Sequence, residues 1–168
     1  MAYIDYAFYS SLYTTPPVEE ADFNRYVYDA CRKVDMMTTG NDGVKKLKVA
    51  FPTNEDDAMA VKRCVVAVVD IMHRIRQAEE TLTSARGYIT RADGNLQGKV
   101  VTSVSAGNES ISFSSGSSSA ATIIDKALAD NAVQTKLYRD TVTEYLSGVP
   151  DANGVGLLYM GNYPYKVG

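Results

Sequence analysis

Apolar residues recur at steps of three and four positions in several stretches of the chain, which is the spacing of one helix face. The clearest stretch follows Thr53 and Asn54, either of which can cap a helix. Its apolar stripe is Val61, Val65, Val68, Met72, Ile75 and Leu82, widened in the middle by Val66, Val69 and Ile71. We therefore expect a long central helix of about eight turns, buried on more than one side.

Two further helical regions flank this one. A first helix is predicted to start near Val18, after two prolines, and to end at Gly40. Residues 120–148 predict a short helix and then a longer one after Asn131, with a stop at 147–150. Between the first and central helices, residues 44–51 are interpreted as a linker with one helical turn; it carries Lys45, Lys46 and Lys48.

The character of the chain changes between residues 87 and 119. Gly87, Asp93-Gly94 and Gly98 are turn signals, 99–104 and 110–114 read as two strands, and 106–108 can turn the chain. An isolated hairpin is marginal in water, and a Ser/Gly-rich tract follows it. We therefore predict a β-hairpin arm that pairs with a neighbouring subunit, with interface residues Val100, Val101, Val104, Ile111 and Phe113.

Both ends of the chain are rich in aromatic residues. Residues 1–17 are interpreted as an extended aromatic arm whose Tyr3, Tyr6, Phe8 and Tyr9 must pack on their own domain or on a neighbour. Residues 149–168 are apolar but follow neither helical nor strand spacing. We predict that this tail contacts another protein through Leu157, Leu158, Tyr159, Met160, Tyr163 and Tyr165.

These patterns predict a mainly α fold, a small helical bundle around a long central helix, with a β-hairpin arm and extended N- and C-terminal segments. The 168 residues suit one domain. Its predicted parts are the arm 1–17, the helical core 18–86, the hairpin and Ser/Gly-rich arm 87–119, the helices 120–148 and the tail 149–168.

Candidate catalytic chemistry is sparse. The net charge is −3, so no global basic field draws the protein to nucleic acid. Cys31 and Cys64 are expected to be free, buried thiols, and His73 is the only histidine, a packed or surface residue rather than a catalyst. Residues 151–154 resemble the start of a calcium loop but lack its remaining ligands. We therefore expect no enzyme, no cofactor and no metal site, and neither a signal peptide nor a membrane span.

Several sequence phrases, in collinear order over nearly the whole chain, resemble the head–tail connector (head-completion or adaptor) proteins of tailed phages and prophages of Gram-positive hosts. Each phrase alone is weakly specific. They are MAYIDY at 1–6 with Phe8-Tyr9, EADFNR at 20–25, TTG at 38–40, VKKLKVAFP at 44–52, AVKRC at 60–64, GKVVTSVS at 98–105, YLSGVPDANGV at 145–155 and LYMG at 158–161.

This resemblance implies a non-enzymatic virion protein at the head–tail interface, assembled in the bacterial cytoplasm. Copies of it would form a ring, expected to be dodecameric, below the portal protein. The ring would extend the channel through which genomic DNA passes without sequence-specific binding, and would carry the next neck, stopper or tail protein. The phage, the host, the ring symmetry and the place of the hairpin stay open.

Two other functions remain alternatives. One is another neck or tail-completion (stopper) protein, a class that is usually richer in strands. The other is a small DNA-binding phage regulator that uses Lys45, Lys46, Lys48, Lys62 and Arg63, which predicts salt-sensitive DNA binding.

Overall fold

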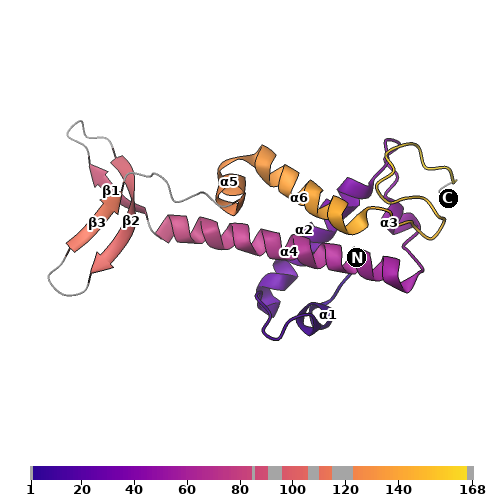
Figure 1. The fold of residues 1–168 in the computed structure, drawn as a ribbon, viewed down its shortest axis with the longest axis horizontal. Coiled ribbons are helices and arrows are strands. Elements are labelled where there is room, and N and C mark those ends of the chain that lie inside the picture. The colour runs from indigo at the N-terminus through magenta and orange to yellow at the C-terminus, as the bar shows by residue number, and fades with distance from the viewer. Residues whose placement is uncertain (1, 85, 91–95, 106–109, 115–122, 166–168) are drawn as a thin grey trace. The chain divides into compact units, whose positions relative to one another are not determined.

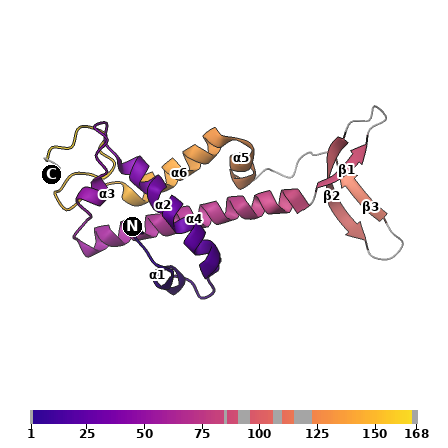
Figure 2. The ribbon, with the colours of Figure 1, turned by 180° about the vertical axis from the view of Figure 1, so that it is seen from behind.

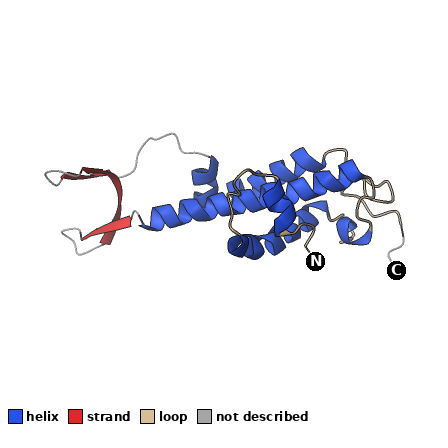
Figure 3. Ribbon diagram, turned by 90° about the horizontal axis from the view of Figure 1, so that it is seen from below, coloured by secondary structure: helices blue, strands red, loops and turns tan. Residues whose placement is uncertain are grey.

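The computed structural model describes the backbone of residues 2–84, 86–90, 96–105, 110–114 and 123–165, and the side chains of residues 2–81 and 123–165. This part of the chain is mainly helical, as its sequence predicts (Figure 1; Figure 3). It divides into two compact units, Met1–His73 with Ala132–Gly168, and Arg74–Asn131. The long helix α4, Glu55–Ser84, contributes residues to both.

The first unit is a helical body. It contains α1 (Tyr6–Ser11), α2 (Glu20–Thr38), α3 (Lys46–Val49), the first part of α4 and nearly all of α6 (Asn131–Leu146). Helix α6 runs beside α4, and α2 crosses α4 at a steep angle, seen from the front in Figure 1 and from behind in Figure 2. The apolar faces of these helices form the core: Phe23, Val27, Ala30 and Val34 on α2, Val61, Val65 and Val68 on α4, and Tyr138, Val142 and Leu146 on α6.

Local signals set the ends of the long helices. Asn54 rather than Thr53 caps α4, because its Oδ1 accepts from the backbone N–H of Asp56 at 2.9 Å and of Asp57 at 3.3 Å. Glu55, Asp56 and Asp57 place negative charge in the first turn, where the helix dipole favours it. After α6, Gly148 has φ of 80°, the left-handed conformation that ends a helix at the predicted stop.

The N-terminal segment is not the extended arm that was predicted, because residues 6–11 form the helix α1. The side chain of Asp5 accepts a hydrogen bond from the Phe8 backbone N–H at 2.8 Å and so caps this helix. Tyr6, Tyr9 and Tyr13 are spaced three and four residues apart, so the helical period was already present in the sequence.

The second unit contains the end of α4, a sheet and α5 (Ile123–Ala129). The sheet has three antiparallel strands in the order β1 (Arg86–Thr90), β2 (Leu96–Ser105) and β3 (Ser110–Ser114). The prediction of a two-stranded hairpin is therefore corrected to a sheet of three strands among the described residues. Gly87 and Gly98, interpreted as turn residues, lie in β1 and β2 instead, where Gly87 is opposite Lys99 and Tyr88 is opposite Gly98. Glycine favours turns but is tolerated in strands, so only the pairing of the chain decides between the two.

Some predicted features lie outside the described residues. They are the turns at Asp93-Gly94 and at 106–108, and the Ser/Gly-rich tract after Ser114.

Both cysteines are free and buried in the first unit, as predicted. Burial raises the pKa of the Cys64 thiol to about 12, and burial also raises the pKa of Cys31. The unfolded thiol loses its proton near pH 9 whereas folded Cys64 keeps it, so the unfolded state is favoured as the pH rises above 9.

We expect Cys64 to lower the free energy of unfolding by roughly 1 kcal/mol between about pH 9 and pH 10. Urea unfolding at these two pH values measures it. Cys64→Ala should show a smaller fall, whereas Val65→Ala, an equally buried truncation, should keep the wild-type pH slope. Equal slopes in all three proteins would contradict the assignment.

Candidate assembly surface

The C-terminal tail is held against the first unit by a buried lysine. Lys46 is fully buried, and its Nζ donates hydrogen bonds to the carbonyl oxygen of Leu157, at 3.0 Å, and to that of Tyr159. Burial lowers the pKa of Lys46, while the charges of Asp151 and Asp42 act in the opposite direction. A buried ammonium must be compensated, and here the tail backbone supplies the acceptors.

The turn before α3 makes a second set of contacts with the tail. The Asp42 carboxylate accepts a hydrogen bond from the backbone N–H of Tyr163 at 2.6 Å. This hydrogen bond is the main reason that the pKa of Asp42 lies below its usual value. The N–H of Asn41 donates to the Met160 carbonyl at 3.0 Å. A Cβ on Gly40 would lie 2.8 Å from the carbonyl oxygen of Gly161, so only glycine permits this approach.

A buried carboxylate organises the start of the tail. Asp151 accepts from the N–H groups of Asn153 and Val155, both at 2.9 Å, and from the Tyr163 hydroxyl at 2.6 Å. The sequence at 151–154 is thus an Asp-centred turn rather than part of a calcium loop. Gly154, with φ of 79°, completes the turn.

The tail residues predicted to form an interface divide into two groups. Leu157 and Tyr163 are buried and fasten the tail to its own unit, and Leu158 is partly buried. Tyr159, Met160 and Tyr165 remain 53%, 50% and 51% exposed, and we call these three residues the tail patch. The structure therefore places apolar side chains in solvent on a backbone that is held in place.

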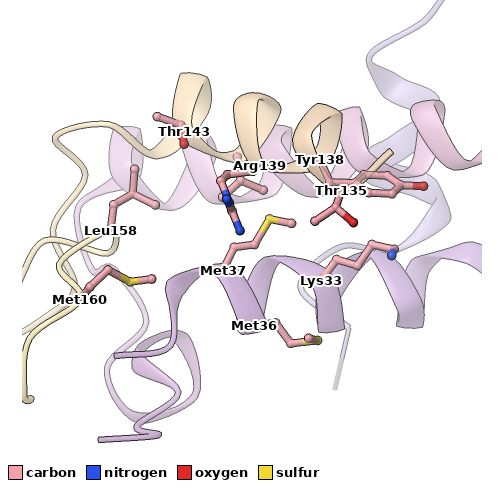
Figure 4. Close-up of a pocket in the computed structure, with 10 residues that line it drawn as sticks. Lys33, Met36, Met37, Thr135, Tyr138, Arg139, Thr143, Leu158 and Met160 are labelled. Atoms are coloured by element: carbon pink, nitrogen blue, oxygen red, sulfur yellow. The ribbon is translucent and has the colours of Figure 1, made fainter. Parts of the chain in front are cut away.

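A groove of about 550 Å³ adjoins the tail (Figure 4). Helix α2 forms one side and α6 the other, and Leu158 and Met160 stand at the end where the tail runs past. Lys33 crosses part of the groove, with its Nζ 4.4 Å from the centroid of the Tyr138 ring. The lining residues are Lys33, Met36, Met37, Thr135, Tyr138, Arg139, Val142, Thr143, Leu158 and Met160.

The aromatic N-terminal residues pack on their own unit. Tyr9 is fully buried, with its ring 5.0 Å from that of Phe23, and its hydroxyl donates to Asp70 at 2.7 Å. Tyr3 stacks on Phe51 and donates to Asp35 at 2.5 Å. Tyr6 contacts Phe23, and Lys62 lies over the ring of Phe8. The sequence left open whether this segment packs on its own domain or on a neighbouring subunit. In the structure it packs on its own unit.

The residues predicted for the hairpin interface lie on β2 and β3. Val101 is paired with Phe113 and Val104 with Ile111, across an irregularity in register between Val101 and Ser103. Val100 is opposite Ser114. A bulge of this kind shifts one strand by a residue relative to its neighbour.

The five basic residues proposed for DNA binding do not all face solvent, because Lys46 is buried whereas Lys45, Lys48 and Arg63 are exposed. Lys46 is buried under the tail, Lys48 pairs with Asp35 at 3.5 Å, and the ammonium of Lys62 lies 5.5 Å from the Phe8 ring centroid. Phosphate binding needs cations that face solvent together. This arrangement weighs against the DNA-binding alternative.

Other candidate chemistry in the described part of the chain is limited. Both ring nitrogens of His73 are buried without a hydrogen-bond partner among the described residues, and Tyr26 packs edge-on against the ring. Within the same residues there is no group of three or more His, Cys, Asp or Glu side chains placed to hold a metal. None of the described helices combines the length and apolarity needed to cross a bilayer.

Comparison with known proteins adds no relative. No protein-family model, no curated protein and no solved structure matches the chain.

Sequence reasoning missed the residues that hold the tail. Lys46 was interpreted as part of a solvated linker, yet it stands beside Leu47 and four residues before Ala50, both buried. Helical spacing places all three on one face, which was the available signal. No comparable local signal marks Gly40 or Asp42, because their partners lie more than a hundred residues away.

Proposed function

We propose that this chain is a structural subunit of a tailed bacteriophage or prophage, a head–tail connector protein that forms a ring below the portal. The observation that carries the proposal is the tail patch of Tyr159, Met160 and Tyr165, exposed on a segment that Lys46 and Asp42 hold in place. An ordered apolar surface of this kind suits binding to another protein.

The physical reason is the cost of ordering. A disordered segment loses conformational freedom when it binds, whereas a segment that is already fixed loses little and keeps more of its contact energy. Tyrosine and methionine are enriched in protein interfaces, and exposed apolar clusters commonly mark them. The tail patch is therefore proposed to contact the portal or the next neck protein.

The sheet supports a ring contact between copies. Its outer strands β1 and β3 are different in sequence, and neither has a second partner strand among the described residues. Open edges invite pairing with another chain. If β1 of one copy pairs with β3 of the next, the contact is heterologous and can close into a ring. Under this proposal Ile111 and Phe113 lie on the edge strand β3, which meets a neighbouring copy, whereas Val100, Val101 and Val104 lie on the central strand β2.

The family resemblance supplies the rest of the proposal. The resemblance implies a virion protein at the head–tail interface, in a dodecameric ring that extends the DNA channel. The net charge of −3 fits a conduit, because a strongly basic wall would retain phosphates and slow the passage of DNA. The mainly helical fold favours a connector over a strand-rich stopper protein.

The proposal is tested with a variant that changes the tail patch and leaves the tail's buried residues in place. In Tyr159→Ser/Met160→Ser/Tyr165→Ser, we expect binding to the purified portal protein of the same phage or prophage to fall at least about tenfold. Three exposed apolar residues elsewhere provide the control variant, Leu12→Ser/Tyr28→Ser/Val49→Ser, which should bind as the wild type does.

Circular dichroism and thermal unfolding verify that both variants keep the wild-type fold. Deletion of residues 157–168 is a poorer test, because it also removes buried Leu157 and Tyr163. Unchanged portal binding by the tail-patch variant, or no portal binding by the wild type, would refute this function.

A further inference from the structure

The groove between α2 and α6 combines methionine side chains with positive charge (Figure 4). Met36, Met37 and Met160 line it, and Met36 and Met160 are half or more exposed. Lys33 and Arg139 are the two charged residues in the lining, and both are basic. We call this feature the methionine groove. Methionine is flexible and adapts to a partner's shape, so such a lining suits an apolar side chain accompanied by carboxylates.

A second, polar pocket extends the positive charge along α2. It has a volume of about 350 Å³, shares Met36 with the methionine groove and is lined by three basic side chains, Arg32, Lys45 and Lys48. Its carboxylate, Asp35, is largely buried and already accepts from Tyr3 and pairs with Lys48. This face is thus locally basic on a chain whose net charge is negative.

One exposed segment of the same chain has the complementary composition. The first turn of α4 carries Glu55, Asp56 and Asp57, followed by Met59, which is 38% exposed. Asn54 occupies the backbone N–H groups of Asp56 and Asp57, and the three carboxylates form no ion pair within the described residues. This turn therefore presents free negative charge beside one apolar side chain.

We propose that the methionine groove of one copy receives the first turn of α4 from a second copy. This inference rests on the proposed ring and names one of its contacts. Met59 enters among the methionines, and the carboxylates of the turn meet Lys33 and Arg139. Because the groove and the turn are different surfaces, the contact is heterologous and each copy can use both at once.

Charge reversal tests the pairing. Variant A is Lys33→Glu/Arg139→Glu, and variant B is Glu55→Lys/Asp56→Lys. Each variant alone places like charges at every contact, so we expect its self-association at low salt to weaken at least about tenfold. In a mixture of A and B, every A–B contact again joins opposite charges, so association should return. Native mass spectrometry and sedimentation, with and without purified portal protein, measure the assemblies.

Cysteine cross-linking gives an independent measurement. Met36→Cys mixed with Met59→Cys should form a disulfide-linked dimer, and neither variant alone should do so, because the contact is heterologous. Native Cys31 and Cys64 are buried and do not compete. Asn24→Cys, an exposed position on α2, mixed with Met59→Cys is the control and should remain uncross-linked.

The outcomes separate this contact from the proposed function. Wild-type rings that are insensitive to A and B, or an A–B mixture that stays dissociated, would overturn the contact and leave the connector function standing. If variant A lost portal binding but kept its self-association, the groove would bind an acidic segment of the portal. The proposal that a second copy occupies the groove would then be wrong. No wild-type self-association, with or without portal, would remove the ring itself.

Discussion

Replacing Tyr9 by Ala is expected to lower the free energy of unfolding by about 3–5 kcal/mol, the range for removing a large buried ring. Tyr9 has no exposed surface, and its ring lies 5.0 Å from that of Phe23 and 5.2 Å from that of Tyr13. The substitution would leave a cavity between α1 and α2 and would remove a hydrogen bond to Asp70. Urea unfolding followed by circular dichroism measures the change.

Two further variants separate the contributions of Tyr9. Tyr9→Phe keeps the ring and removes only the hydroxyl that donates to Asp70, so it should cost about 1–2 kcal/mol. Tyr28→Ala, at a tyrosine that is 65% exposed, should change stability by no more than about 0.5 kcal/mol. A Tyr9→Ala protein as stable as the Tyr28→Ala protein would show that the N-terminal segment does not belong to the core.

Replacing Lys46 by Met is expected to release the C-terminal tail and to cost about 2–4 kcal/mol. Methionine retains an unbranched apolar side chain in the buried site but leaves the carbonyl oxygens of Leu157 and Tyr159 without a donor. Hydrogen bonds from a charged group are worth about 1.5–3 kcal/mol each, and relief of the buried charge offsets part of their loss. Urea unfolding measures the cost.

Amide hydrogen exchange tests the release of the tail directly. In Lys46→Met, the backbone N–H groups of Leu157 and Tyr163 should exchange faster. The tail is then no longer held in place, so the hydrogen bonds that these groups donate open more often. Lys45→Met is the matched control: its side chain is exposed, and both stability and exchange should stay at the wild-type level. Unchanged protection of the tail in Lys46→Met would mean that Asp42 and Asp151 suffice to hold it.

Lys46 also links stability to the proposed function. The tail patch is useful for binding because the tail is ordered, so Lys46→Met should weaken portal binding even though Tyr159, Met160 and Tyr165 are unchanged. In Lys46→Met the contacts with the portal remain possible, but the released tail must become ordered when it binds, and this weakens the binding. The tail-patch variant, in contrast, keeps the tail ordered and loses the contacts themselves. Comparing the exchange data of the two variants distinguishes these causes.

The sequence by itself determined the helices and most of their ends. The apolar stripe of α4, the cap at Asn54 and the stop at Gly148 all depend on residues within a few positions of one another. Helical periodicity and capping are local, so they can be read from a single chain. The two buried, free cysteines followed from their place in these helices.

Only the tertiary structure decided which parts of the two ends are buried. Leu157 and Tyr159 are both apolar positions of the tail, and Lys46 binds both carbonyl oxygens across 111 and 113 positions of the chain, yet the side chain of Leu157 is buried and that of Tyr159 is exposed. The third strand of the sheet is likewise defined by its pairing, in which Gly87 lies opposite Lys99. Local propensity carries no information about such distant partners, and the balance of burial and hydrogen bonding among them sets the surface that another protein meets.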